Sequence, residues 1–373
     1  MKKIYYIAVV FAILFLAGCG DGIDLPGVNV ETDLNKIPLP DNNVNLEQVE
    51  LKPSTEPMLH EGLHTEEDFQ RIRDKKAAGE EPWVSAYQLL VESQFSQKTA
   101  DTYPTEWIKR GVSGDENYMN AARGATIAYQ QALRWKIEQD DEYAAKAVEN
   151  LNKWVQTCVG VTGNTNLSLA AGLYGYEFAI AGELLRDYEG WDRADFAAFQ
   201  NWLLKVFYPA NDDFLKRHHD TNALHYWANW CLCNIAAKMA IGIVTDRRDI
   251  YNEGIAHLQT GDTNGRLRRA IYHDYAPDYN FAQWQESGRD QGHTLMCVGL
   301  MGVICQLAWS QGDDFFAYDD NLFMRACEYA ACCNYTNETV PYTTYIWQKQ
   351  SQWGYPIPEE QTTLGGGKWI KRA

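Results

Sequence analysis

Side chains that could neutralise and deprotonate an acidic sugar gather in one part of the sequence, residues 218–293. Six of the eight histidines lie there, together with asparagine, arginine and tyrosine residues. Amide and guanidinium groups donate hydrogen bonds to carboxylates, and imidazole and phenol groups exchange protons with a substrate. The set therefore predicts a site for an acidic saccharide.

The first motif spans residues 222–230 and reads Asn-Ala-Leu-His-Tyr-Trp-Ala-Asn-Trp. Asn222, His225 and Asn229 are three and four residues apart, so a helix that starts at Asn222 would place them on or near one face. Their amide and imidazole groups could then hydrogen-bond a sugar carboxylate. The plainer interpretation is that His225 is an internally bonded helix histidine and Asn229 a packing residue.

The second motif, residues 268–275, reads Arg-Arg-Ala-Ile-Tyr-His-Asp-Tyr and is expected to form a loop. Loops on rigid scaffolds are common places for reactive groups. A tyrosine beside arginine and histidine can have a lowered phenol pKa, because nearby positive charge favours the phenolate. Such a tyrosine could accept or donate a proton, and the candidates are Tyr272, Tyr275 and Tyr279.

The third motif, residues 287–293, reads Ser-Gly-Arg-Asp-Gln-Gly-His and precedes an apolar helix. Arg289 offers a fork that suits a carboxylate. Asp290 could hold Arg289 or orient a neighbouring histidine such as His293. The plainer interpretation is an internal Arg289–Asp290 ion pair at the start of the helix, although this leaves His293 unexplained.

The segments that must position these motifs show helical periodicity and almost no strand alternation. About ten helices are expected, over residues 65–78, 82–95, 117–138, 141–158, 167–188, 193–207, 222–243, 246–258, 290–310 and 319–335. Their connections are short or moderate, and no fixed repeat is visible. These features predict an all-α fold in which antiparallel helical hairpins form an (α/α) toroid or incomplete barrel.

Charge and composition narrow the class of partner. The formal net charge of −17 argues against nucleic acid, which needs a basic face. Thirteen tryptophans and 22 tyrosines could supply flat faces for stacking on sugar rings. An acidic substrate would need basic residues concentrated locally, as they are at residues 266–269.

The N-terminus predicts export. Lys2 and Lys3 precede an apolar run, and Leu-Ala-Gly-Cys at residues 16–19 resembles a bacterial lipoprotein cleavage site. We expect a signal peptide over residues 1–19, lipidation of Cys19, a flexible tether over 20–58 and a folded domain over 59–373. The protein would be extracytoplasmic, in the periplasm or at the cell surface, and held at the outer membrane only by its lipid. The other eight cysteines are expected to be mostly free and buried.

The three motifs together resemble a known family. Residues 222–230 are similar to the Asn-Asn-His-x-Tyr-Trp-x-x-Trp helix of (α/α)-toroid alginate lyases. Residues 269–275 resemble the segment that carries their catalytic tyrosine, and residues 285–293 resemble a motif of the wider alginate-lyase-domain family of Bacteroidetes lipoproteins. The similarity extends over about residues 59–345.

This resemblance implies cleavage of alginate or a related polyuronate by β-elimination, which leaves a C4–C5 unsaturated uronate. Asn222 and His225 would neutralise the C5 carboxylate, assisted by Asn229 or Arg289. Tyr275 would be the acid, or both acid and base, and His293 is a second candidate for the base. Further contacts to the saccharide are expected from Trp227, Trp284, Gln285, Arg269 and Tyr279.

Two other classes of protein fit the same residues. A glycoside hydrolase on the same toroid would need two carboxylates beside the scissile bond, and Glu286 and Asp290 are the available pair. A non-catalytic glycan-binding lipoprotein would use the aromatic residues alone. No cofactor or metal is expected, because the histidines at 218, 219, 225 and 293 lack a recognisable ligand spacing. The chain is expected to act as a monomer.

Overall fold

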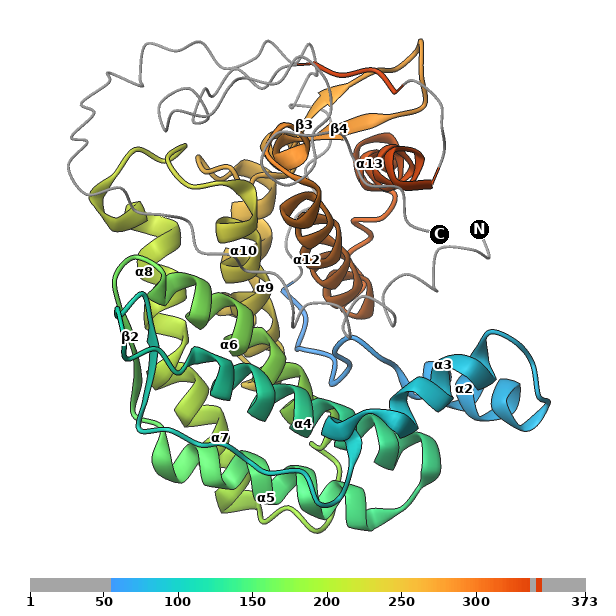
Figure 1. The fold of residues 1–373 in the computed structure, drawn as a ribbon, viewed down its shortest axis with the longest axis vertical. Coiled ribbons are helices and arrows are strands. Elements are labelled where there is room, and N and C mark those ends of the chain that lie inside the picture. Colours follow the sequence, from blue (N-terminus) through green and yellow to red (C-terminus); the bar gives the residue numbers. More distant parts are fainter. Residues whose placement is uncertain (1–54, 336–339, 344–373) are drawn as a thin grey trace.

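Four long helices form the inner layer of the fold in a computed structural model that describes residues 55–335 and 340–343. They are α4 (Tyr118–Glu138), α6 (Leu167–Leu184), α9 (Ala228–Val244) and α12 (Gln291–Ser310). Consecutive inner helices pack on each other in a curved row (Figure 1). Gly172 allows α6 to approach α9 closely, because a Cβ there would lie 2.5 Å from Sγ of Cys233.

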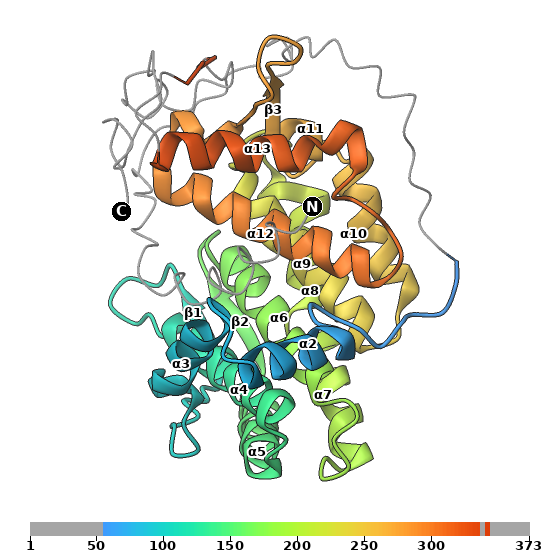
Figure 2. The same cartoon turned by 90° about the vertical axis from the view of Figure 1, so that its right-hand side faces the viewer.

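The outer helices cover this row. They are α5 (Asp141–Thr157), α7 (Arg193–Val206), α8 (Tyr208–Arg217), α10 (Arg248–Thr260) and α13 (Tyr318–Tyr335), with α2 (Glu66–Ala77) and α3 (Trp83–Glu92) before them. Each inner helix packs on the outer helix that follows it, as α12 does on α13 in Figure 2. The fold is therefore the expected (α/α) toroid of helical hairpins.

Helix α12 meets the length and composition of a membrane-spanning helix, but more than half of its apolar stretch is buried against the rest of the protein. It packs on α9 and α13. Its apolar character is accounted for by its place in the inner layer of the toroid, because a helix covered on several sides is apolar nearly all round.

Two helix predictions need correction. No helix was expected between residues 207 and 222, but α8 occupies most of this stretch, and Pro209 stands in its first turn where proline is well tolerated. The next helix was expected to start at Asn222, but α9 begins at Ala228. Residues 218–220 all have positive φ, which ends α8 and prevents an uninterrupted helix.

Short strands replace loops at two places. Strand β1 (Trp107–Arg110) pairs in parallel with β2 (Gly160–Gly163), and β3 (Ile271–Asp274) pairs antiparallel with β4 (Ala282–Trp284). The second pair is a hairpin where the sequence analysis expected a loop. It places His273 opposite Gln283, and a register irregularity lies between Ile271 and His273.

The segment before α2 crosses from α12 toward α6. The side-chain amide of Gln311, just after α12, bonds both backbone groups of Leu59 and the carbonyl of Glu61. His60 lies 3.4 Å from Asp246, at the end of α9. This segment therefore bridges the ends of α9 and α12 before the chain enters α2.

All eight cysteines from Cys158 to Cys333 are free, and seven of them are buried, as expected. The predicted signal peptide, Cys19 and the tether up to residue 54 lie outside the described residues, as do residues 344–373 of the expected domain.

Candidate active site

The three motifs meet at the N-terminal ends of the inner helices. Ser168, in the first turn of α6, bonds His219 of the segment before α9 at 2.9 Å. Asn229, in the first turn of α9, bonds Glu286, which lies just before α12. The amino ends of α6, α9 and α12 are thus tied together by short polar contacts, and each carries the positive end of a helix dipole.

A buried carboxylate, Glu286, joins the first motif to the third. Its side chain has 0% exposure and accepts hydrogen bonds from the backbone and side-chain amides of Asn229 and, at 3.1 Å, from Arg289. Arg289 also lies over the ring of Trp227, 5.2 Å from its centroid. Because Glu286 fixes one side of the guanidinium, the direction of Arg289 is set while its side chain remains 19% exposed.

Asp290 and His293 form a second pair at the same helix end. Asp290 caps α12 by accepting a hydrogen bond from the His293 backbone through Oδ1, and its Oδ2 lies 2.6 Å from Nδ1 of His293. Although burial alone would raise it, the pKa of Asp290 is lowered by these bonds from His293 and by Arg289. An ionised Asp290 holds a proton on Nδ1, which leaves Nε2 as the nitrogen that can accept one. The sequence-based suggestion that Asp290 orients a histidine matches this geometry.

The hairpin places two of its three tyrosines, Tyr272 and Tyr275, around one buried amide. The Tyr275 hydroxyl donates to Oε1 of Gln283 at 2.5 Å, and Nε2 of Gln283 donates to the Tyr272 hydroxyl at 3.0 Å. Tyr272 packs on Trp227 in a small buried cluster. A continuous chain of contacts therefore runs from Arg289 through Trp227, Tyr272 and Gln283 to Tyr275.

Ion pairs anchor the hairpin to α13. Asp274, at the end of β3, binds Arg325, and Arg268 binds both Asp274 and Asp319. Both arginines are buried. Although burial alone would raise it, these guanidinium groups lower the pKa of Asp274. The hairpin is thus fixed on two sides, by this network and by the contact of Tyr272 with Trp227.

One electrostatic expectation for this hairpin is wrong. A tyrosine flanked by basic residues was expected to have a lowered phenol pKa, but burial raises the pKa of Tyr275 to about 12. Arg268 does not act on the phenol because it is committed to Asp274 and Asp319. Tyr275 is therefore a protonated phenol at neutral pH.

Asn222 and His225 lie on the segment before α9 rather than on a helix face. The Asn222 side chain accepts a hydrogen bond from the Leu224 backbone at 2.8 Å, and the His225 ring packs edge-on against Tyr226. Both are half-buried. The expected spacing of Asn222, His225 and Asn229 along one helix face is wrong, because α9 starts after the first two.

Several residues expected to contact the saccharide have structural roles instead. Trp284 and Gln285 have 0% exposure; Trp284 donates to the carbonyl of Ala326, and Gln285 accepts from the Ala228 backbone at the start of α9. Asn229 is also buried, against Glu286. None of the three side chains exposes enough surface in this structure to contact a saccharide.

The other expected contacts differ in exposure. Trp227 is buried under Arg289, and Arg269 donates to the carbonyl of Asp262. Tyr279, at the turn of the hairpin, is 51% exposed. Of these three side chains, Tyr279 has the surface that a sugar ring could stack on.

Gln283, Thr343 and the Ser168–His219 pair were not expected from the sequence. Gln283 lies outside the three motifs, and its partner Thr343 is 60 residues away along the chain. Ser168 and His219 are 51 residues apart. No local pattern signals such contacts, because they depend on how distant helices pack.

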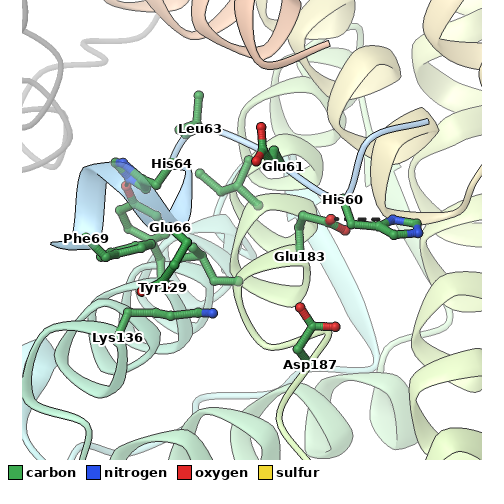
Figure 3. Close-up of a pocket in the computed structure, with 13 residues that line it drawn as sticks. His60, Glu61, Leu63, His64, Glu66, Phe69, Tyr129, Lys136, Glu183 and Asp187 are labelled. Carbon is green, nitrogen blue, oxygen red and sulfur yellow. Dashed lines mark hydrogen bonds and ion pairs between the residues drawn. The ribbon is translucent and has the colours of Figure 1, made fainter. Parts of the chain in front are cut away.

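A separate pocket lies at the opposite ends of the inner helices. It has a volume of about 290 Å³ and lies between the segment before α2 and the carboxyl ends of α4 and α6 (Figure 3). His64 bonds Tyr129 at 2.6 Å in its wall, and burial lowers the pKa of His64 to about 4. Its other walls include Lys136, Glu183 and Asp187. None of the residues expected to act on a saccharide lines this pocket.

Comparison with known proteins places this arrangement in context. The sequence model of the alginate lyase family matches residues 72–338. A search of curated proteins found no match. Among solved structures, an alginate lyase from Bacteroides ovatus has 15% identity and a TM-score of 0.53, covering 80% of this chain and 86% of that one.

Alginate lyase A1-III is similar to the same extent. The enzyme from Sphingomonas species A1 has 12% identity and a TM-score of 0.51, with 83% of this chain and 95% of that one covered. A tyrosine-to-phenylalanine variant of A1-III, complexed with a tetrasaccharide, gives 14% identity and a TM-score of 0.53 over the same shares of the two chains. At these identities the likeness shows a shared fold.

Proposed function

This chain belongs to the alginate lyase family of polysaccharide lyases, and from that premise we propose that it cleaves alginate or a related polyuronate by β-elimination. The observation that carries the proposal is the chain of contacts from Arg289 to Tyr275. This chain of contacts links the guanidinium of Arg289 to the protonated phenol of Tyr275, and Asp290, 3.7 Å from the Arg289 guanidinium, holds the imidazole of His293 beside it. These are the groups that elimination next to a carboxylate requires.

The first requirement is to stabilise the negative charge that develops when C5 loses its proton. Arg289 has a fixed direction and a partly exposed guanidinium, which suits a uronate carboxylate. The amino ends of three inner helices add positive potential at the same place. Asn222 and His225, half-buried on the neighbouring segment, are proposed to donate further hydrogen bonds to that carboxylate.

The second requirement is a base and an acid. We assign the base to Nε2 of His293, whose other nitrogen is held by Asp290. Nε2 takes the C5 proton, the C5–H electron pair forms the C4–C5 double bond, and the C4–O bond breaks. The leaving oxygen takes the proton of Tyr275, whose pKa of about 12 keeps it protonated at neutral pH.

The structure argues against the hydrolase alternative, which needed Glu286 and Asp290 as its two catalytic carboxyl groups. Glu286 is fully buried and committed to Asn229 and Arg289, and Asp290 is committed to His293. Hydrolysis needs two carboxyl groups on either side of the scissile bond, with one as acid. Neither of these two residues is free to take that place.

We further propose that the protein is exported and lipid-anchored at Cys19 and takes an acidic oligosaccharide or polysaccharide outside the cytoplasm. The support is the charged, apolar and small-residue pattern of residues 2–19. Replacing Cys19 by serine should release the protein from the membrane fraction of cells that process lipoproteins. Retention of the variant in that fraction would contradict an anchor at this residue.

The lyase proposal is tested by incubating the purified protein with polymannuronate, polyguluronate, polyglucuronate and pectate. Elimination yields a C4–C5 double bond that absorbs ultraviolet light, and mass spectrometry of the products would show an unsaturated end without added water. Saturated products would indicate hydrolysis. Binding without any product would indicate a glycan-binding protein, and either outcome would overturn the proposal.

A further inference from the structure

The buried amide of Gln283 makes two hydrogen bonds through its oxygen and two through its nitrogen. Oε1 accepts from the Tyr275 hydroxyl at 2.5 Å and from the Thr343 backbone amide at 2.8 Å. Nε2 donates to the Tyr272 hydroxyl at 3.0 Å and to the Thr343 carbonyl at 2.9 Å. The side chain has 0% exposure, so water does not replace these partners.

The backbone of Thr343 fixes the orientation of this amide. A carbonyl oxygen can only accept a hydrogen bond and a backbone N–H can only donate one. Nε2 of Gln283 must therefore face the Thr343 carbonyl, and Oε1 must face the Thr343 amide. If the Gln283 amide were reversed, Nε2 would face the Thr343 N–H, donor against donor, and Oε1 would face the Thr343 carbonyl, acceptor against acceptor.

This orientation fixes the role of each phenol. Oε1 of Gln283 is an acceptor only, so the protonated Tyr275 phenol donates to it, and the Thr343 hydroxyl is a more distant second partner of the phenol at 3.1 Å. Nε2 is a donor only, so Tyr272 accepts from it and donates its own proton to the Thr343 carbonyl. Tyr272 and Tyr275 are thereby made different, because Tyr275 donates to a side-chain amide oxygen whereas Tyr272 donates to a backbone carbonyl.

We propose that Gln283 is a positioning residue, whose amide holds Tyr275 as a protonated hydrogen-bond donor and so reserves it for the acid step. A hydrogen bond accepted from the neutral phenol favours the neutral form over the phenolate. Gln283 acts through Tyr275 and does not contact substrate. This inference depends on the acid role of Tyr275 in the proposed function.

The test compares Gln283→Leu with Gln283→Glu in the full-length protein. Leucine keeps an apolar side chain of similar size but removes both hydrogen bonds to the phenols. Glutamate keeps an acceptor for Tyr275 but turns a second oxygen toward the Thr343 carbonyl and adds buried negative charge. Gln131→Leu is the control, because Gln131 is equally buried but bonds Gln97 on the outer side of α4.

The first readout needs no substrate. Ultraviolet titration of tyrosine, with a Tyr275→Phe variant as the reference for subtraction, follows the ionisation of the Tyr275 phenol. In the unsubstituted protein and in Gln131→Leu this phenol should stay un-ionised up to about pH 11, and in Gln283→Leu it should ionise at lower pH. An unchanged Tyr275 titration in Gln283→Leu would overturn the inference even if the protein cleaves no uronate.

The second readout is turnover of whichever uronate polymer the protein cleaves. Gln283→Leu should lower kcat by ~10-fold or more with little change in KM, and the alkaline limb of its kcat/KM profile should move to lower pH. Gln283→Glu should lose kcat without that downward move, because added negative charge further disfavours the phenolate. A Gln283→Leu variant that keeps kcat, or that loses activity only in proportion to folded protein, would also overturn the inference.

Discussion

The carboxylate of Asp290 does two things for His293: one oxygen caps the helix by accepting from its backbone amide, and the other lies 2.6 Å from its Nδ1. The two residues are three positions apart at the start of α12. The same helix turn therefore orients the imidazole and fixes which of its nitrogens carries the proton.

Asp290→Asn should separate these two effects. Asparagine caps helices as well as aspartate does, but its NH2 group would face Nδ1 of His293 and force the proton onto Nε2. We expect kcat to fall by ~100-fold or more while the protein stays folded. Asp192→Asn, at the cap of α7, is the control, and equal losses of activity in the two variants would contradict the assignment.

His293 and His225 are expected to differ in what their loss changes. His293→Gln removes the proposed base and should lower kcat by ~100-fold or more. His225→Gln removes one of several proposed hydrogen bonds to the carboxylate, so it should raise KM and lower kcat by a smaller factor, ~10-fold. Steady-state kinetics on the same uronate polymer measures both. If His225→Gln loses kcat and His293→Gln does not, the base is His225.

Tyr275→Phe should abolish most turnover and leave saccharide binding nearly intact, because the phenol donates a proton to the leaving oxygen and its ring remains. A synthetic uronate with a 4-O-aryl leaving group needs no proton on that oxygen, so its cleavage should suffer much less from the substitution. Tyr188→Phe, at the far end of α6, is the control. An equal loss on both substrates would exclude an acid role for Tyr275.

Stability should depend on pH through Glu177, on α6. Burial raises the pKa of Glu177 to about 8, and its buried Oε2 accepts no hydrogen bond from the part of the chain that the structure describes. Because the folded state holds this proton more tightly than the unfolded chain, the group favours folding fully below about pH 4.5, and this contribution is lost as pH rises to about 8.

Glu177→Gln should therefore reduce the loss of folding stability as the pH rises. We expect the melting temperature of the variant to fall less between pH 5 and pH 8 than that of the unsubstituted protein, by roughly several degrees. Thermal unfolding followed by circular dichroism measures this difference, with the exposed Glu189→Gln as the control. A parallel pH dependence in the variant would show that Glu177 is not the group responsible.

The helices of this protein were predictable because their signals are local. Apolar residues recur with helical spacing through α4 and α5, α6 and α12 are apolar over most of their length, and Asp290 and His293 stand close enough in sequence for their pairing to be expected. The start of α9 was not predictable in the same way. The motif from Asn222 to Asn229 reads as a continuous helix, and only the positive φ angles of residues 218–220 and the contacts of Gln285 and Glu286 set the start at Ala228.

The sequence by itself determined the fold class, the family and the types of side chain at the site, because periodicity and short motifs are properties of neighbouring residues. Only the tertiary structure decided how those side chains are buried and which partners they contact. Burial turned Trp284, Gln285 and Asn229 into structural residues and raised rather than lowered the pKa of Tyr275. The partner that orients Tyr275, Gln283, depends on Thr343, 60 residues further along the chain. Burial and such long-range partners are set by the packing of distant helices, which no local pattern records.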